Sequence, residues 1–227
     1  CGAHPKACLK NYQAKPLNPF MCHEVAARIL LGKIARTASE FNYGIKPLLT
    51  LSHKHYFKVF VSLEEGAEKA VESIKATGFL AHCNRCLDRS WKKGVTVNLP
   101  EKCPNCKENM EHAGPLWLGG LHDEGILRKM EKTVGKKDAQ TVKLISLMIG
   151  EEKMPPFYYE LHRLSERLCM NAVKPDTVEG LLAKEGFAVS KTHFQPNSLK
   201  TDAPFGKVER AMRKASGQKD YKRGGSK

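Results

Sequence analysis

Four cysteines in this 227-residue chain are spaced as metal ligands. Cys83 and Cys86 form one C-x-x-C pair, Cys103 and Cys106 form a second, and sixteen residues separate the pairs. This spacing is typical of zinc sites in which each pair contributes two thiolates to one tetrahedral ion. Four protein ligands leave no coordination position for a substrate. We therefore predict a zinc ion with a structural role, which stabilises a module too small to bury a core of its own.

Other interpretations of the cysteines remain open, namely two disulfides or a site that has lost its metal. His82, beside Cys83, is an alternative ligand. The sequence shows no charged segment followed by the apolar core of a secretory signal, so we expect an intracellular, cytoplasmic protein. Thiols stay reduced there, which favours metal over disulfides. We expect no second metal site from the group near the start of the chain, which is Cys1, His4, Cys8, Cys22 and His23.

The chain is strongly basic, with 38 Lys and Arg against 24 Asp and Glu and a formal net charge of +14. Such a surface attracts polyanions, either nucleic acid or an anionic membrane face, although simple solubility is the plainer explanation. The longest apolar stretches, such as 25–31, fall well short of the ~18 residues that a membrane span needs. Eight of the last 21 residues are Lys or Arg. We predict that 207–227 is a basic, disordered tail.

No catalytic centre is recognisable among the residues of this chain. The sequence contains neither a G-x-G-x-x-G loop nor a G-x-x-x-x-G-K-S/T loop, which cradle the phosphates of nucleotide cofactors. No Ser/His/Asp constellation stands out among its nine histidines. We therefore predict no catalytic and no cofactor-binding residue here.

The first part of the chain predicts a mixed, α+β fold. The expected elements are helices at 5–12 and 19–41, strands at 45–52 and 56–63, a helix at 64–76 and a strand at 79–82. Because a short connection joins the first two strands, we expect an antiparallel hairpin. Apolar residues at three- and four-residue spacing give the long helix one buried face, made of Val25, Ile29, Leu30, Ile34, Ala38 and Phe41. Charged residues of that helix, Arg28 among them, are expected largely outside this face.

The second part of the chain predicts a zinc-ribbon-like module at about 79–118, followed by a helical region. Its expected elements are helices at 121–132, 139–148, 158–170 and 174–186 and a short strand at 187–190. Asp138 is expected to cap the second of these helices. The glycine-punctuated stretch 114–120 is expected to be a packed turn that anchors Trp117, and 191–206 is rich in turn residues. Residues 158–190 could form a winged-helix unit.

Several segments together resemble the tRNA (guanine-26 N2)-dimethyltransferase family. They are 1–3, 45–49, 55–61, the two Cys pairs, 114–119, 121–123, 192–194 and 200–204. The most specific are Gly-Pro-Leu-Trp-Leu-Gly at 114–119 and Thr-His-Phe at 192–194, which is followed by Lys-Thr-Asp-Ala-Pro at 200–204. Their order and spacing match the family over roughly 1–206, and the basic tail lies outside the match.

The resemblance implies a methyltransferase whose Rossmann-like domain binds S-adenosylmethionine and whose family-specific C-terminal domain helps to hold tRNA. The cofactor loop and the catalytic Asp-Pro segment of the family do not occur in this sequence. We therefore expect the chain to be the C-terminal portion of such an enzyme, inactive alone, with its cofactor bound by a preceding half. Residues 1–65 would then be the last helix and strand hairpin of the catalytic domain, and 66–206 the C-terminal domain.

Under this resemblance the basic groups would contact RNA phosphates, in a manner that weakens with salt. The candidates are Lys92, Lys93, Arg210, Arg213 and Lys214. Trp91 could stack on RNA or belong to the core of the zinc module. The alternative function is a non-catalytic zinc-ribbon protein that binds nucleic acid, and a ribosome-associated zinc protein is a weaker option. We make no prediction of oligomeric state.

Overall fold

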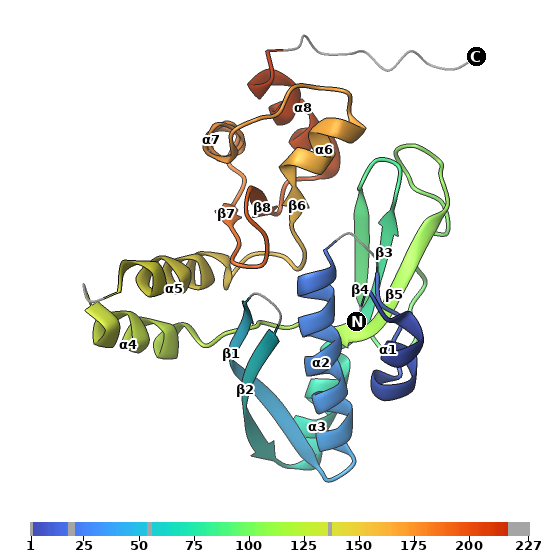
Figure 1. The fold of residues 1–227 in the computed structure, drawn as a ribbon. Helices are drawn as coiled ribbons and strands as arrows, with labels where there is room; N and C mark the ends of the chain where they lie inside the picture. The colour runs from blue at the N-terminus through green and yellow to red at the C-terminus, as the bar shows by residue number, and fades with distance from the viewer. Residues whose placement is uncertain (1, 18–20, 54–55, 136–137, 218–227) are drawn as a thin grey trace.

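The computed structural model describes residues 2–17, 21–53, 56–135 and 138–217, and Figure 1 shows their arrangement. The first elements in chain order are α1 (Pro5–Tyr12), α2 (Cys22–Ser39), β1 (Tyr43–His53), β2 (Tyr56–Glu65) and α3 (Ala67–Lys75). They are followed by β3 (Thr77–Cys83), β4 (Arg89–Lys93), β5 (Met110–Trp117), α4 (Glu124–Val134) and α5 (Ala139–Glu151). The last elements are β6 (Tyr159–Glu160), α6 (Leu161–Arg167), α7 (Pro175–Lys184), β7 (Val189–Lys191), β8 (Ser198–Thr201) and α8 (Phe205–Ala215).

The predicted hairpin is confirmed, because β1 and β2 pair antiparallel from Tyr43 opposite Glu65 to His53 opposite Tyr56. The helix α2 lies against this hairpin, as Figure 1 shows. Its predicted face is correct at Val25 and Ile29, which are fully buried. It is wrong at Phe41, which lies beyond the end of the helix and is 69% exposed. The expected start of this helix at Pro19 lies outside the described residues.

A second sheet with the order β4–β3–β5 carries the cysteine pairs. The predicted strand at 79–82 is confirmed as part of β3, but β4 and β5 were not predicted. The expectation of a packed turn at 114–120 was wrong for 114–117, which belong to β5 and pair with β3. Trp117 is anchored as expected, because it is buried and its Nε1–H donates to the Gly120 carbonyl at 2.8 Å. The helix α2 packs directly on β5 at Gly32, where a Cβ atom would lie 3.1 Å from the Leu116 Cα. A glycine therefore allows this close approach of helix and strand.

The helices α4 and α5 pack side by side around Leu127, Ile145 and Met148. Asp138 caps α5 as predicted, because its carboxylate accepts hydrogen bonds from the backbone N–H groups of Gln140 and Thr141. Among the described residues, no helix combines the length and the apolar character that a membrane crossing requires.

The third sheet has the order β6–β8–β7 and lies with α6, α7 and α8 at the top of Figure 1. Two expectations were wrong here. The helix predicted at 158–170 begins with the short strand β6, and β8 lies in the stretch that was expected to be only turns. The predicted disorder from 207 onward was also wrong for the described part of the tail. Residues 205–215 form α8, whose apolar side chains Val208, Ala211 and Met212 are buried. Residues 218–227 lie outside the described part.

One hydrophobic cluster joins elements on both sides of the predicted domain boundary at 65/66. Ile29 on α2 shares it with Leu80 on β3, Leu116 on β5 and Phe157 ahead of β6. This shared core fixes the cysteine module and the third sheet against the helix of the first part. The boundary itself stays a prediction.

Candidate functional site

The two cysteine pairs sit in turns with the same backbone design. The Cys83 carbonyl accepts a hydrogen bond from the Leu87 N–H at 2.9 Å, and the Cys103 carbonyl accepts one from the Lys107 N–H at 2.9 Å. Leu87 and Lys107 have positive φ angles of 63° and 62°, which closes each turn. Each turn therefore brings its two sulfur atoms to one side. β3 ends at Cys83, opposite Met110 at the start of β5, so the sheet holds the two turns together.

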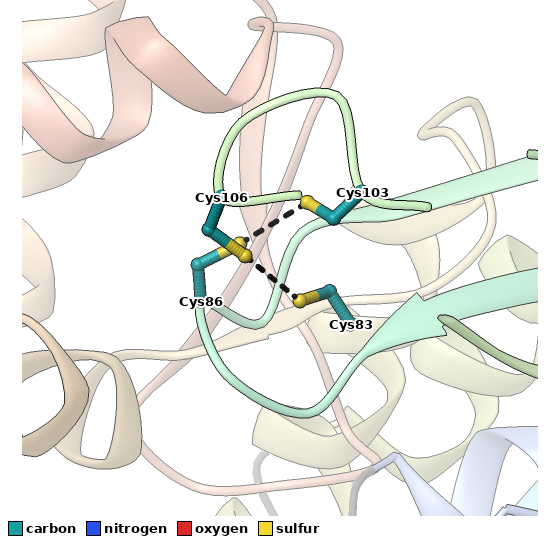
Figure 2. Close-up of side chains that lie close together, drawn as sticks. All are labelled: Cys83, Cys86, Cys103 and Cys106. Carbon is teal, nitrogen blue, oxygen red and sulfur yellow. Dashed lines mark hydrogen bonds between the residues drawn. The ribbon is translucent and has the colours of Figure 1, made fainter. Parts of the chain in front are cut away.

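The four sulfur atoms converge on one point, as Figure 2 shows. The Sγ atoms of Cys83 and Cys106 are 3.3 Å apart, and those of Cys86 and Cys103 are 3.5 Å apart. A disulfide needs about 2.0 Å, so these pairs are thiols and not disulfides. A tetrahedron of thiolates around zinc, with Zn–S bonds of ~2.3 Å, has edges of roughly 3.8 Å. The spacing of the sulfurs thus fits a single zinc-sized cation.

Burial of the sulfur atoms affects their charge state. Cys83 and Cys103 are fully buried, and Cys86 is nearly so. Burial raises the pKa of the Cys83 and Cys86 thiols, because an unpaired thiolate is costly in an apolar setting. A soft divalent ion reverses this preference by binding the deprotonated sulfurs directly. The donor set of the four cysteines fits zinc.

The other sequence candidates for metal ligands lie elsewhere. His82 directs its Nδ1 atom toward the Asn84 amide oxygen at 3.1 Å, away from the sulfur cluster. Cys1 lies outside the described residues. The remaining members of the group near the start of the chain form no converging set within the described ranges, and they are His4, Cys8, Cys22 and His23.

A buried charge network, which sequence reasoning missed, lies where α2, α5 and β8 meet. The Lys200 ammonium contacts the Glu24 carboxylate at 3.0 Å and the Glu151 carboxylate at 3.0 Å. Arg28 also pairs with Glu24, at 2.9 Å. Burial alone would raise the pKa of Glu151, but Lys200 and His193 outweigh it and hold that pKa well below its usual value. Both carboxylates are therefore ionised in the folded protein.

Arg28 belongs to this network although the helical pattern of α2 placed it outside the buried face. Its guanidinium donates to the backbone carbonyls of Trp117 and Gly119, at 3.0 and 3.1 Å. A side chain this well satisfied can be buried at little cost. The only available signal was indirect, because Lys200 and His193 fall in the segments quoted for the family resemblance.

His122, Glu151 and His193 bring three possible metal ligands together, but their hydrogen bonds differ from those of metal-bound histidines. The Thr50 N–H donates to the Nδ1 of His122 at 3.3 Å, and the Ser52 N–H donates to the Nε2 of His193 at 3.4 Å. The opposite nitrogen of each ring must therefore carry the proton. A histidine ligand presents a lone pair to its metal and donates from its other nitrogen, which is the reverse of this arrangement.

The predicted RNA contacts fall on two separate elements. Lys92 and Lys93 are exposed on β4. Arg210, Arg213 and Lys214 lie on α8, where Arg213 pairs with Glu209 at 2.9 Å. Whether any of them touches RNA stays a prediction.

Trp91 belongs to the core rather than to an exposed stacking surface. It packs against the main hydrophobic cluster, with its ring 6.1 Å from that of Phe157 in an edge-on arrangement. Of the two roles considered for this side chain, the packing favours the structural one.

Comparison with known proteins identifies relatives along almost the whole chain. The family model described as N2,N2-dimethylguanosine tRNA methyltransferase matches residues 1–213. The tRNA (guanine(26)-N(2))-dimethyltransferase of Methanobrevibacter smithii is 36% identical over 220 residues, which cover 95% of this chain and 57% of that protein. The enzyme of the same name from Pyrococcus abyssi is 38% identical over 212 residues, which cover 90% of this chain and 52% of that protein.

A solved structure shows the same fold. It is the complex of Trm1 from Pyrococcus horikoshii with S-adenosyl-L-methionine, which matches with a TM-score of 0.83 and 34% identity. The match covers 93% of this chain and 55% of that one. This chain thus spans about half the length of the curated relatives it matches.

Proposed function

The chain belongs to the N2,N2-dimethylguanosine tRNA methyltransferase family, and from this membership we propose that it is the C-terminal portion of a tRNA (guanine-26 N2)-dimethyltransferase. The proposed contribution of this portion is tRNA binding and a structural zinc site. The observation that carries the proposal is the continuous match over residues 1–213 to enzymes nearly twice as long. No observation favours the alternative of a non-catalytic zinc-ribbon protein.

S-adenosylmethionine supplies the methyl group in the proposed reaction and is bound by the other half of the enzyme. We assign no residue of this chain to it, because the sequence holds no glycine-rich cofactor loop. The acceptor is the exocyclic amine of a guanine, which must leave its stack to be reached. The role of this chain is to hold the RNA so that the target lies in the reaction centre.

The two edges of the β1–β2 hairpin support the proposed division between a catalytic domain that ends at residue 65 and a C-terminal domain. The outer edge of β1 is covered, because Leu48, Thr50 and Ser52 bond through their backbones to Asp123, His122 and His193. Among the described residues, β2 pairs only with β1. Its Phe60 and Leu63 side chains are exposed. A larger Rossmann-like sheet would therefore continue through β2, as expected if residues 1–65 end a catalytic domain.

We assign the zinc to Cys83, Cys86, Cys103 and Cys106, where it would cross-link the two turns that follow β3 and precede β5. It would stabilise the loop 94–109, which has no hydrophobic core of its own. The metal has no part in methyl transfer under this proposal, since all four coordination positions belong to cysteine.

The third sheet supports a nucleic-acid role through its connectivity. The order strand, two helices, two strands, from β6 to β8, is that of a winged-helix unit, and α8 adds a basic surface. We propose that Arg210, Arg213 and Lys214 on α8, together with Lys92 and Lys93 on β4, contact tRNA phosphates.

The test compares binding with turnover. The purified, zinc-loaded chain is expected to bind tRNA, with an affinity that falls steeply as salt rises, and to transfer no methyl group from labelled S-adenosylmethionine. The control is a full-length relative under the same conditions. Turnover by this chain alone would contradict the assignment of catalysis to the other half. Equal affinity for tRNA and for an unrelated polyanion would contradict the tRNA assignment.

A further inference from the structure

Arg89 joins the two parts of the molecule that carry the proposed RNA contacts. It is the first residue of β4, the strand that also carries Lys92 and Lys93. Its guanidinium donates to the Phe157 carbonyl at 2.9 Å and lies over the ring of Tyr159, 3.5 Å from the ring centroid. Phe157 lies just ahead of β6 and Tyr159 is on β6. Arg89 therefore reaches from the cysteine module to the third sheet, which leads into α8.

The guanidinium of Arg89 is buried at this contact. The residue is only 8% exposed, and its Nε and Nη1 atoms have no hydrogen-bond partner in the described part of the chain. Burying a cation with donors left over is costly unless another group attracts it. The electron-rich face of the Tyr159 ring does so, and such an attraction is strongest where both groups are desolvated. Tyr159 is therefore held to Arg89 by more than apolar packing.

The backbone of Arg89 is anchored to both cysteine turns through Asp88. The Asp88 carboxylate accepts from the Arg89 N–H at 2.8 Å and from the side-chain amide of Asn105, which lies between the cysteines of the second turn. The Asp88 carbonyl accepts from the Cys83 N–H at 2.9 Å. The start of β4 is thus fixed to the cysteine module, and the guanidinium extends from this fixed base.

On the other side of the contact, Tyr159 continues the packing to α8. Its ring centroid is 6.3 Å from that of Phe205, the first residue of α8, which is 6% exposed. Val208 and Met212 of α8 belong to the same hydrophobic cluster as Tyr159 and Cys86. The buried face of α8 therefore rests on a core that it shares with the cysteine module.

We propose that Arg89 is a positioning residue for tRNA, which holds α8 in a fixed place relative to the basic end of β4 by way of Tyr159. This role rests on the proposed function, which assigns phosphate contacts to both elements. Two groups of contacts whose spacing is fixed beforehand lose less conformational entropy on binding than two that move independently. Arg89 itself is buried, so it contacts no phosphate.

The first experiment measures tRNA affinity against salt for the zinc-loaded chain. Arg89→Met keeps a long side chain but removes the charge and the donor to the Phe157 carbonyl. Affinity is expected to fall roughly fivefold, because the two elements are no longer held together before binding. The slope of log affinity against log salt should stay unchanged, whereas loss of a direct phosphate contact would reduce it by about 1. Arg89→Lys, which keeps a charge and a donor, should recover part of the lost affinity.

Hydrogen exchange tests the positioning of α8 without RNA. The α8 amides of Arg89→Met should exchange about tenfold faster than those of the wild type, because a buried bond from a charged donor is lost. Zinc content, and the absorption spectrum after cobalt replaces zinc, should be unchanged, since all four cysteines remain. Tyr159→Leu removes the ring from the other side of the contact, leaves β4 intact and should give the same faster exchange.

The matched control is Arg85→Met, which removes an exposed arginine from the first cysteine turn and should leave exchange in α8 unchanged. Unchanged α8 exchange in both Arg89→Met and Tyr159→Leu, equal acceleration in the Arg85 control, a reduced salt slope in Arg89→Met or no recovery with lysine would each overturn the role of Arg89. If the wild type bound no tRNA, the proposed function would fail, and exchange alone would still decide whether Arg89 holds α8. If wild type and Arg89→Met bound tRNA equally, the role of Arg89 would be refuted and the proposed function would stand.

Discussion

The Lys200 ammonium on β8 donates to the Glu24 carboxylate on α2 at 3.0 Å, which joins residues 176 positions apart in the chain. Lys200 is 1% exposed and Glu24 is fully buried. Glu24 also accepts a hydrogen bond from the Phe157 N–H at 2.9 Å. A single carboxylate on α2 therefore contacts both the third sheet and the segment before β6. The pair therefore links the third sheet to α2.

Replacing Lys200 by Met is expected to destabilise the protein by about 3–5 kcal/mol, because it leaves two buried carboxylates with one fewer cation. Chemical denaturation of the zinc-loaded chain measures this loss. Lys207→Met is the matched control, since Lys207 pairs with Glu185 at 2.7 Å on the surface, where solvent screens the charges. A similar loss of unfolding free energy in both variants would show that the buried network stabilises the protein no more than a surface ion pair does.

Stability is expected to fall as the pH drops below about 6.5. The folded-state pKa of His122 is lowered to about 3, mainly by burial, so between these values the unfolded chain takes up a proton that the folded chain does not. Each such histidine lowers the free energy of unfolding by about 1.4 kcal/mol for every pH unit between its unfolded-state and folded-state pKa values. Unfolding free energies at pH 7, 6 and 5 should therefore decline less steeply in His122→Gln than in the wild type. Parallel slopes would contradict a buried neutral His122.

Cys103→Ser is expected to release the zinc and unfold the cysteine module. Cys103 is fully buried and supplies one of four ligands, and the remaining three sulfurs bind the ion far more weakly. Metal analysis should give one zinc per chain for the wild type and little for the variant. Cys169→Ser, at an exposed position, is the control and should retain the metal. A wild-type chain that folds without metal would contradict the structural role of the zinc.

Removing two exposed charges from α8, with Arg210→Ala and Lys214→Ala, is expected to lower tRNA affinity and to reduce the slope of log affinity against log salt by about 2. Substitution is preferable to truncation here, because deleting α8 would expose Val208 and Met212. Lys75→Ala with Lys132→Ala removes the same charge elsewhere. An unchanged salt slope in the α8 variant would mean that this helix does not contact RNA.

Local patterns predicted much of this architecture. The alternation of β-branched and aromatic residues in 56–63 and the short connection before it were sufficient for the hairpin. The C-x-x-C spacing was sufficient to predict each cysteine turn, because each turn is closed by a backbone bond between near neighbours, and the pairing of β3 with β5 brings the two turns together. Asp138 likewise caps the helix that it precedes.

Features that depend on distant parts of the chain were missed. The tail from 207 was expected to be disordered because its charge is high, but four apolar positions of α8 find a buried surface on neighbouring elements. The short strands β4 and β8 depend on pairing with β3 and with β6 and β7, and patterns within such short segments do not reveal these partners. Arg28 was expected outside the buried face of its helix, but the carbonyls of Trp117 and Gly119 that satisfy it are remote in sequence. The carboxylates that pair with Lys200 are likewise remote from it in sequence.

The one-sided cover of the β1–β2 hairpin has a consequence for self-association. Exposed strand edges invite pairing between molecules, and repeated pairing at both edges builds fibres. Here the imidazoles of His122 and His193 occupy backbone donors on β1, so growth from that side is blocked. Under the proposed function, β2 is then the edge of this hairpin that a further strand of the catalytic sheet can join, and the two histidines set the direction in which that sheet grows.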